Sequence, residues 1–471
     1  SHPLPPTPTH FHPLLPTPMH PNKPPCPSAP THGPHTPKVA GCWVGASTNC
    51  HETTEGWRAR RRAAPLPPAK CSRDFDCSGA NGRCIGSECV CSPGWAGSRC
   101  GQVAWKQRSA RTPFDIDAAH MRGWWTWGAS PAIDDGGKHH LFVSQISNDC
   151  GIHHYQTNSR IVHMTAPAAT GPYTPAADFD VLPPRASHWD DGATHGVTVH
   201  RLPNRSWALY YMGFEKNWPQ PTHPNCTAGS GEAWANTTFG DHAGRRIGIA
   251  LSESLDGPWR RLDAPIFGPA SDAWDNFDVS NPAPIFMRSG RVVLVYKGRG
   301  SRTQAMGLAF GSSPLGPFVR NDSGAAPAHG FVGGEDPFCY QDERTAILHC
   351  FTHTGNGESG AGGHAYSEDG VHWTQGEMAF TGRVQWSSGN TSVLLRRERP
   401  QILLIRSAIA NGANSSLTHS SVIGHPAANG ANSSLGHPSV IFTSAQDCRA
   451  PAADAGSVCR SYTMLEEVDL A

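Results

Sequence analysis

The chain lacks both a net charge and a long apolar segment, and each absence argues against one class of binding partner or location. Its 38 Lys and Arg residues balance 38 Asp and Glu residues, so no overall charge attracts it to nucleic acid or to an anionic membrane. No apolar run approaches the roughly 20 residues that a membrane-spanning helix needs. We therefore expect no nucleic-acid partner and no membrane span.

Charged residues are also scarce, at 16% of the chain, whereas Gly (50 residues) and Pro (42 residues) are abundant. Both residue types interrupt helices and supply turns. Short apolar strands lie between these turn signals along most of the chain. This pattern predicts an all-β fold, which is a sandwich, a barrel or a propeller.

Cysteine is plentiful, with 15 residues, and seven Asn-x-Ser/Thr sites accompany it: Asn204, Asn225, Asn236, Asn321, Asn390, Asn414 and Asn432. Disulfides and N-linked glycans both form in the secretory pathway. We therefore expect a secreted or lumenal glycoprotein. The first residue is Ser and no charged-then-apolar leader is visible, which we interpret as a processed start or a fragment.

One pattern recurs five times: polar residues and a proline open a short strand, and a polar turn and a second apolar strand follow. Its sharpest copy begins at Glu335-Asp336-Pro337, and the others begin near Ser130, His195, Asn281 and Glu398. A third strand ending at a Gly-x-aromatic corner follows four of these copies, at Gly171, Gly257, Gly316 and Gly370. Four-stranded antiparallel units repeated around an axis form a propeller. Five first strands therefore predict five blades, although the sequence does not show which strand closes the ring.

Composition divides the chain into three parts. Residues 1–70 are rich in Pro and His, and we expect a disordered, extended linker there. Residues 71–100 contain six closely spaced cysteines, and residues 101–471 contain the repeats. The last blade is interrupted, since an eight-residue segment at 410–417 recurs at 428–435. We interpret 406–436 as a low-complexity insertion between the first and second strands of that blade.

The cysteine-rich part reads Cys71-x5-Cys77-x6-Cys84-x4-Cys89-x-Cys91-x8-Cys100, with a Gly-Trp-Ala-Gly segment before its last cysteine. It resembles an epidermal-growth-factor-like module, and the resemblance implies the disulfides Cys71–Cys84, Cys77–Cys89 and Cys91–Cys100. A unit of this length cannot build an apolar core large enough to stabilise its fold. Its stability must therefore depend on the disulfides. The acidic residues that precede calcium-binding modules are absent here, so we expect no calcium. Its expected role is that of a spacer or a contact for another extracellular protein.

Further disulfides are suggested by position. Cys339 and Cys350 lie on opposite arms of one predicted hairpin, and Cys448 and Cys459 flank a short loop. Weaker candidates are Cys150–Cys226 and Cys42–Cys50, which leaves Cys26 unpaired.

The blade pattern also predicts where a ligand binds. In an antiparallel meander, the starts of the first strands and the loops between second and third strands lie at the same end. Polar residues of both kinds should therefore surround one mouth of the central channel, which is the expected substrate site. The candidates are Ser130, His195, Asn281, Arg299, Asp336, His353 and Arg399.

The first strands of the five predicted blades open on x-Pro, and Glu335 precedes the Asp-Pro of the fourth. In these features the chain resembles the superfamily of glycoside hydrolase families 43, 32 and 68. The resemblance covers roughly Trp124 to Leu470. It implies a base on the first blade, an Asp that tunes the acid on the third, and a general acid Glu on the fourth. Glu335 matches the acid, whereas Ser130 and Asn281 stand where the two other carboxylates are expected.

Glycoside hydrolysis needs an acid with a raised pKa and a second carboxylate. The substitutes that could reach the mouth are Asp278 and Asp149, together with Asp190 and Asp191, although Asp before a strand is also a common turn residue.

Two functions stay open. The first is a secreted glycosidase that hydrolyses O-glycosyl bonds of a glycan or glycoconjugate, with Glu335 as general acid. The second is a propeller that binds carbohydrate or protein at an extracellular surface without catalysis. We expect no cofactor and no metal site of zinc type, and we leave open a calcium ion in the channel.

Overall fold

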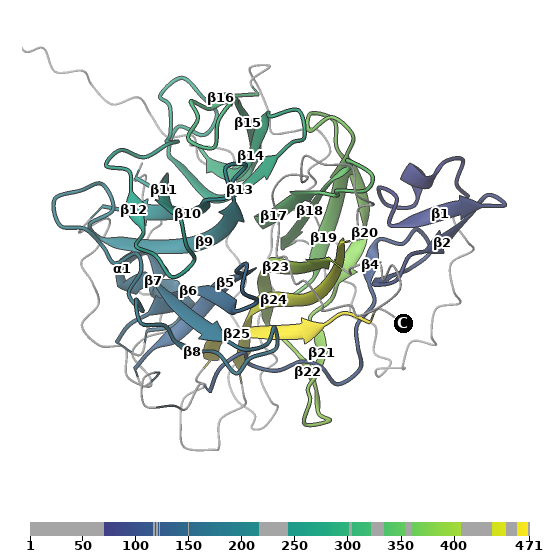
Figure 1. Ribbon diagram of the computed structural model, residues 1–471, viewed down its shortest axis with the longest axis horizontal. Helices are drawn as coiled ribbons and strands as arrows, with labels where there is room; N and C mark the ends of the chain where they lie inside the picture. Colours follow the sequence, from purple (N-terminus) through teal and green to yellow (C-terminus); the bar gives the residue numbers. More distant parts are fainter. Residues whose placement is uncertain are drawn as a thin grey trace, which may run out of the picture. The chain divides into compact units, whose positions relative to one another are not determined.

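The computed structural model describes residues 70–115, 118, 121, 123–148, 150–215, 244–300, 304–321, 334–353, 360–406, 436–448 and 459–469. Their regular structure is almost entirely β-strand (Figure 1). The helical elements are η1 (Asp74–Asp76), η3 (Ile152–His154) and α1 (Tyr155–Asn158). No helix in the described ranges has the length and apolar character that a membrane crossing requires. The predicted linker, Lys70 apart, lies outside the described residues.

Four sheets of four strands follow one another along the chain, and a sheet of three strands completes the series (Figure 1). Within each sheet consecutive strands pair antiparallel, as a meander requires. The strands of the five sheets, in order, are β5 (Trp125–Ile133), β6 (His139–Ile146), β7 (Ser159–Ala166) and β8 (Thr174–Pro175); β9 (Ala193–Arg201), β10 (Trp207–Phe214), β11 (Arg246–Ser252) and β12 (Arg260–Arg261); β13 (Asp278–Phe286), β14 (Val292–Arg299), β15 (Gln304–Gly311) and β16 (Val319–Arg320); β17 (Glu335–Gln341), β18 (Leu348–His353), β19 (Gly362–Ser367) and β20 (Thr374–Phe380); and β23 (Arg396–Arg406), β24 (Gly436–Cys448) and β25 (Cys459–Glu467).

The first strands of the five sheets form a closed ring. β5 contacts β9, β9 contacts β13, β13 contacts β17, β17 contacts β23, and β23 contacts β5 again. The predicted five-bladed propeller is therefore confirmed. In the fifth blade β23 ends at Arg406 and β24 begins at Gly436, and the residues between them, to which the predicted insertion was assigned, lie outside the described part.

Apolar clusters between neighbouring blades hold the ring together. Because successive side chains of a strand point to opposite faces, each inner strand contributes to two clusters. In β6, Phe142 packs with Val197 and Leu209 of the second blade, whereas Leu141 packs with Phe442 of the fifth. Every residue of β6 is buried, as expected of a strand covered on both faces, and its apolar residues run consecutively from Leu141 to Val143.

The N-terminal end of the propeller closes the fifth blade. Antiparallel bridges join Trp105 to Val468 and Arg111 to Leu465, so this segment lies beside β25 as an outer fourth strand. The Arg111 guanidinium also pairs with Glu467 at 2.5 Å. The two ends of the repeat region are therefore joined by backbone hydrogen bonds within one blade.

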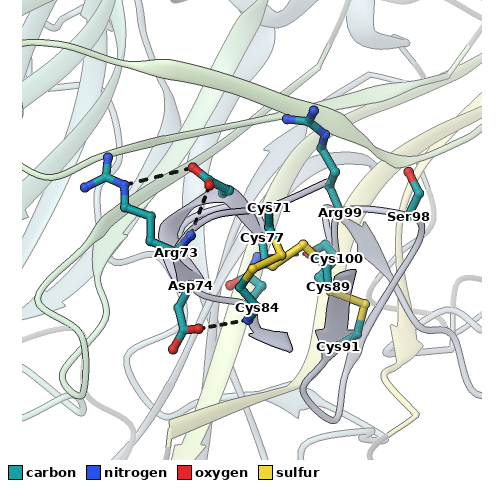
Figure 2. The surroundings of a disulfide bond; sticks show 12 residues. Cys71, Arg73, Asp74, Cys77, Cys84, Cys89, Cys91, Ser98, Arg99 and Cys100 are labelled. Atoms are coloured by element: carbon teal, nitrogen blue, oxygen red, sulfur yellow. Dashed lines mark hydrogen bonds and ion pairs between the residues drawn. A yellow bond between two sulfur atoms is a disulfide. The ribbon is translucent and has the colours of Figure 1, made fainter. Parts of the chain in front are cut away.

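Four disulfides predicted from the sequence are confirmed. Cys71–Cys84, Cys77–Cys89 and Cys91–Cys100 hold the cysteine-rich part, which contains β1 (Gly82–Ile85), β2 (Glu88–Cys91), β3 (Trp95–Ala96) and β4, whose two residues are Gln102–Val103 (Figure 2). Cys339–Cys350 joins β17 to β18 at directly opposed positions.

The remaining cysteine predictions lie wholly or partly outside the described residues. Cys150 is disulfide-bonded, but its predicted partner Cys226 is not described. Cys448 and Cys459 oppose one another in the β24–β25 register, and their side chains are not described. Cys26, Cys42 and Cys50 lie in the undescribed N-terminal part.

The cysteine-rich part packs against β18, β19 and β20 of the fourth blade. Trp95 stacks on Phe351 with 5.9 Å between ring centroids, and on His364 with 5.8 Å. The Glu377 carboxylate of β20 accepts hydrogen bonds from the Ser98 hydroxyl (2.9 Å) and from the backbone N–H groups of Arg99 (3.2 Å) and Gly101 (3.1 Å). The expected spacer is thus fixed to the propeller, because its aromatic side chain and its backbone donors both find partners there.

We expect Glu377→Ala to lower the free energy of unfolding by about 1.5–3 kcal/mol, because it leaves backbone donors without a charged acceptor. Glu368→Ala is the matched control, since it removes a surface ion pair with Arg73 whose two side chains are both 56% exposed. That change should cost about 1 kcal/mol or less. Denaturant unfolding of the full chain measures both, and equal losses would contradict this account.

Candidate functional site

Each first strand contains a β-bulge near its start, where its register with the second strand shifts. A bulge redirects the side chain at its centre. In every blade one residue at the bulge has a positive φ, between 51° and 75°: Gly128, Gly196, Asn281, Asp336 and Arg399. These five residues are the equivalent positions of the five blades, and they lie together at the centre of the ring.

The first of these positions corrects the sequence interpretation. The bulge of the first blade lies at Gly128, two residues before Ser130. Ala129 stands where prolines follow the bulges of the last three blades, so Ser130-Pro131 was a misleading x-Pro signal. Ser130 is buried farther along β5, where its hydroxyl donates to Gln401 Oε1 (3.2 Å) and accepts from the Val199 N–H (3.0 Å).

The Arg399 side chain extends from the fifth blade across the axis to all the others. Its guanidinium donates to Asn281 Oδ1 (2.8 Å) and pairs with Asp336 Oδ1 (3.3 Å). A Cβ atom placed on Gly128 would lie 2.7 Å from Arg399 Cδ, and one on Gly196 would lie 2.8 Å from its Nη1. The first two blades therefore carry glycine at the bulge because the arginine occupies the space that a side chain would need.

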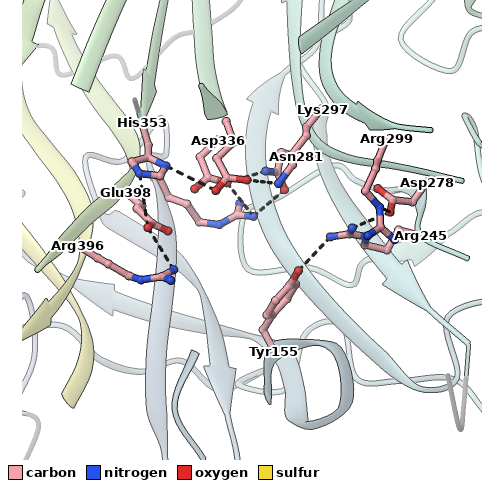
Figure 3. Close-up of polar contacts among 12 residues, drawn as sticks. Tyr155, Arg245, Asp278, Asn281, Lys297, Arg299, Asp336, His353, Arg396 and Glu398 are labelled. Carbon is pink, nitrogen blue, oxygen red and sulfur yellow. Dashed lines mark hydrogen bonds and ion pairs between the residues drawn. The ribbon is translucent and has the colours of Figure 1, made fainter. Parts of the chain in front are cut away.

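Two glutamates precede the bulges of neighbouring blades and face one histidine. Glu335 Oε1 lies 3.7 Å from His353 Nδ1. Glu398 Oε1 lies 3.6 Å from His353 Nε2 (Figure 3). Lys297 of β14 donates to the other oxygen of Glu335. Arg396 pairs with Glu398 at 3.3 Å. The mouth thus holds two carboxylates on either side of a histidine, each with its own cation.

The two glutamates ionise differently. Burial raises the pKa of the Glu335 carboxyl, but the charge and hydrogen bond of Lys297, with His353 and Arg399, bring that pKa down to about 2. Burial raises the pKa of the Glu398 carboxyl above its ordinary value of 4.5, and the charges of Asp336 and Glu335 add to the rise although His353 opposes it. In mildly acidic solution Glu335 is ionised, whereas Glu398 retains its proton more readily.

The other predicted carboxylates have different surroundings. Asp278 is buried, and its Oδ2 accepts from Arg245 Nη2 (2.6 Å) and from Arg299 Nε (2.8 Å) (Figure 3). Asp190 is buried at the second blade, where it binds the Tyr211 hydroxyl (2.8 Å) and Arg261 (2.9 Å). Both therefore neutralise arginines, and Asp149 lies outside the described residues.

His195, predicted as a substrate contact, is a buried neutral group. Its Nδ1 lies 2.7 Å from the Ser159 hydroxyl, and the Tyr155 ring lies 5.0 Å away. Burial, with the charge of Arg399, holds the pKa of His195 well below its ordinary range. The structure thus brings together five predicted residues, namely Asn281, Glu335, Asp336, His353 and Arg399.

Lys297, Arg245 and Arg396 were not predicted as site residues, and Glu398 was predicted only as the start of a first strand at this mouth, without a role. Glu398 precedes Arg399-Pro400 as Glu335 precedes Asp336-Pro337, so aligning the repeats residue by residue finds it. Lys297 and Arg245 carry no comparable signal, because they act through contacts with another strand or another blade.

One group of these residues has metal-ligating atoms close together. Oxygens of Glu335, Asp336 and Glu398 and a nitrogen of His353 lie within 4.8 Å of one another. The three carboxylates are already paired with Lys297, Arg399 and Arg396, respectively. A cation bound there would have to displace these side chains.

No protein-family model matches the chain, and no curated protein matches it. Among solved structures it is similar to Zg3597, a family 117 glycoside hydrolase of the marine bacterium Zobellia galactanivorans, with 15% identity over 78% of this chain and 92% of that one and a TM-score of 0.50. It is also similar to the α-L-arabinofuranosidase PaAbf62A from Podospora anserina (12% identity, 77% and 97% covered, TM-score 0.44). A thermostable family-43 glycoside hydrolase is a third (13% identity, 57% and 81% covered, TM-score 0.39). At such identities the first likeness supports the propeller fold alone, and the other two carry no argument.

We expect Gly196→Ala to destabilise the propeller more than Gly290→Ala. Both residues have positive φ, +65° and +82°, so each change costs about 1–2 kcal/mol of backbone strain. A Cβ on Gly196 also meets the side chains of Arg399 and Met212, each at 2.8 Å, which should add about 1–3 kcal/mol, whereas one on Gly290 meets nothing within 4 Å. Equal losses in denaturant unfolding would mean that Arg399 does not fill the axis.

Proposed function

We propose that the propeller hydrolyses O-glycosyl bonds, with Glu398 as general acid and Glu335 as the ionised second carboxylate. One observation carries this proposal: two glutamates at equivalent positions of neighbouring blades face each other across His353, with pKa values moved in opposite directions. Glycoside hydrolysis needs one protonated and one ionised carboxyl group. The resemblance gave the acid role to Glu335, but its contact with Lys297 favours the ionised form.

The separation of the two groups favours a particular course of reaction. Oxygens of Glu335 and Glu398 lie within 4.8 Å of one another, nearer to the ~5–5.5 Å of retaining enzymes than to the ~6.5–9.5 Å of inverting ones. Glu398 gives its proton to the leaving glycosidic oxygen while Glu335 bonds to the anomeric carbon. Water then displaces Glu335 and gives its proton to Glu398, so the configuration at the anomeric carbon is retained.

The compartment in which this activity takes place is extracellular or the lumen of the secretory pathway. The four described disulfides and the bonded Cys150 support this, because such bonds persist in oxidising compartments. The sites Asn204 and Asn390 are exposed and accessible for glycosylation.

A second candidate is a propeller that binds glycans without cleaving them. The observation that favours it is that Asp278, Glu335, Asp336 and Glu398 are all paired with Lys or Arg side chains. Such pairing holds the carboxylates in place and competes with their use in catalysis.

Glu335→Gln and Glu398→Gln should each reduce hydrolysis about 10²- to 10⁴-fold, since each removes one of the two reacting carboxyl groups. Reducing-sugar release from a panel of polysaccharides identifies the substrate, and Glu368→Gln is the surface control. Aryl glycosides with good leaving groups should restore the rate of Glu398→Gln but not that of Glu335→Gln, because they need little protonation. Wild-type binding without cleavage would establish the second candidate instead.

The pH dependence of kcat/KM should be bell-shaped. The rate rises as Glu335 ionises, at a pKa of about 2, and falls as Glu398 loses its proton at a pKa above the ordinary 4.5. The falling limb should disappear in Glu398→Gln measured with an aryl glycoside. A falling limb that persists unchanged in this variant would assign it to another group.

A further inference from the structure

Cationic side chains outnumber carboxylates at the mouth of the propeller. Among the residues that the structure describes, four carboxylates pair with five cations there: Asp278, Glu335, Asp336 and Glu398 with Arg245, Lys297, Arg299, Arg396 and Arg399. Glu335, Asp336 and Glu398 pair with Lys297, Arg399 and Arg396, respectively. Asp278 pairs with two guanidinium groups, so the surplus positive charge lies beside it.

The two guanidinium groups share one oxygen of Asp278. Arg245 Nη2 and Arg299 Nε both donate to Oδ2, at 2.6 and 2.8 Å. Oδ1 of Asp278 and Nε of Arg245 are buried without a hydrogen-bond partner in the described part of the chain. The Arg245 side chain is 6% exposed and that of Arg299 is 17% exposed. A positive charge held out of water in this way attracts an anionic group strongly, because little solvent screens it.

This arginine pair lies next to the glutamates of the proposed reaction. In Figure 3, Lys297 lies between Arg299 and Asp336, the residue that follows Glu335. Lys297 pairs with Glu335, and β14 carries both Lys297 and Arg299. Burial lowers the pKa of Arg245, but its contacts with Tyr155 and Asp278 and the negative charge of Glu335 raise it overall. A group bound by the arginines would therefore belong to a sugar at or beside the bond that is cleaved.

We propose that the glycan bound at this mouth is acidic, and that Arg299 binds its carboxylate or sulfate group. Arg245 adds its positive charge from behind, because its Nη1 donates to the Tyr155 hydroxyl (3.0 Å) and its Nη2 to Asp278. This inference rests on the proposed function for the location of the site. The planar guanidinium group presents paired donors that match the oxygens of a carboxylate or a sulfate. Arg399 is unsuited to this role, since Asn281 and Asp336 already hold it at the axis.

The test measures binding of the full-length protein to paired polymers that differ only in charge. One pair is polygalacturonate and its fully methyl-esterified form, and the other is a sulfated galactan and its desulfated form. We expect at least about tenfold tighter binding of the charged member of one pair, which identifies carboxylate or sulfate as the group recognised, with affinity falling as salt rises. Equal affinity for the charged and neutral members of both pairs would overturn the inference.

Arg299→Gln should weaken binding of the charged polymer about tenfold and leave binding of the neutral polymer unchanged. The variant keeps one arginine paired with Asp278, so it should fold, and Arg299→Lys should recover part of the affinity. Arg201→Gln is the matched control, because Arg201 pairs with Asp135 at the far end of β9. Unchanged binding by Arg299→Gln would contradict the inference. If the protein cleaves only a neutral polymer, the inference of an acidic glycan is wrong. If it binds an acidic polymer but never cleaves it, that inference stands and only the proposed hydrolysis is refuted.

Discussion

The Arg399 guanidinium is the interaction on which the centre of the propeller depends. One side chain of the fifth blade crosses the axis and contacts the equivalent position of every other blade. It requires glycine at two of those positions, and it finds an amide and a carboxylate at the other two. With the axis filled in this way, the residues just before the bulges are left to form the mouth, and two of them are glutamates.

The chemistry of the mouth follows from how its charges compensate one another. Lys297 stabilises the ionised form of Glu335, whereas burial, together with the negative charges of Asp336 and Glu335, opposes the ionisation of Glu398. A pair of identical side chains thereby acquires different protonation states. The pairing of charges also leaves one guanidinium group in excess beside Asp278. The protonation states of the two glutamates and the preference for an acidic glycan therefore both follow from the pairing of buried charged groups.

Most of the fold could be predicted from the sequence because its signals are local. Strand, turn and proline recur with each blade, and opposed cysteines such as Cys339 and Cys350 lie within one hairpin. The site was less predictable because its contacts join different blades. Arg399 meets Asn281 across 118 positions of the chain, and no local pattern places Lys297 against Glu335. The first blade was misaligned by two residues because Ala129 replaces the proline that follows the bulges of the last three blades.

The central claim is that Glu335 is ionised while Glu398 holds a proton in the same site. Carbon-13 NMR of the glutamate carboxyl groups in the full-length protein, assigned with Glu335→Gln and Glu398→Gln, measures both ionisations directly. We predict that the Glu398 signal titrates above the ordinary value of 4.5 and that the Glu335 signal still reports a carboxylate near pH 3. A Glu335 pKa above that of Glu398 would contradict the account and return the acid role to Glu335.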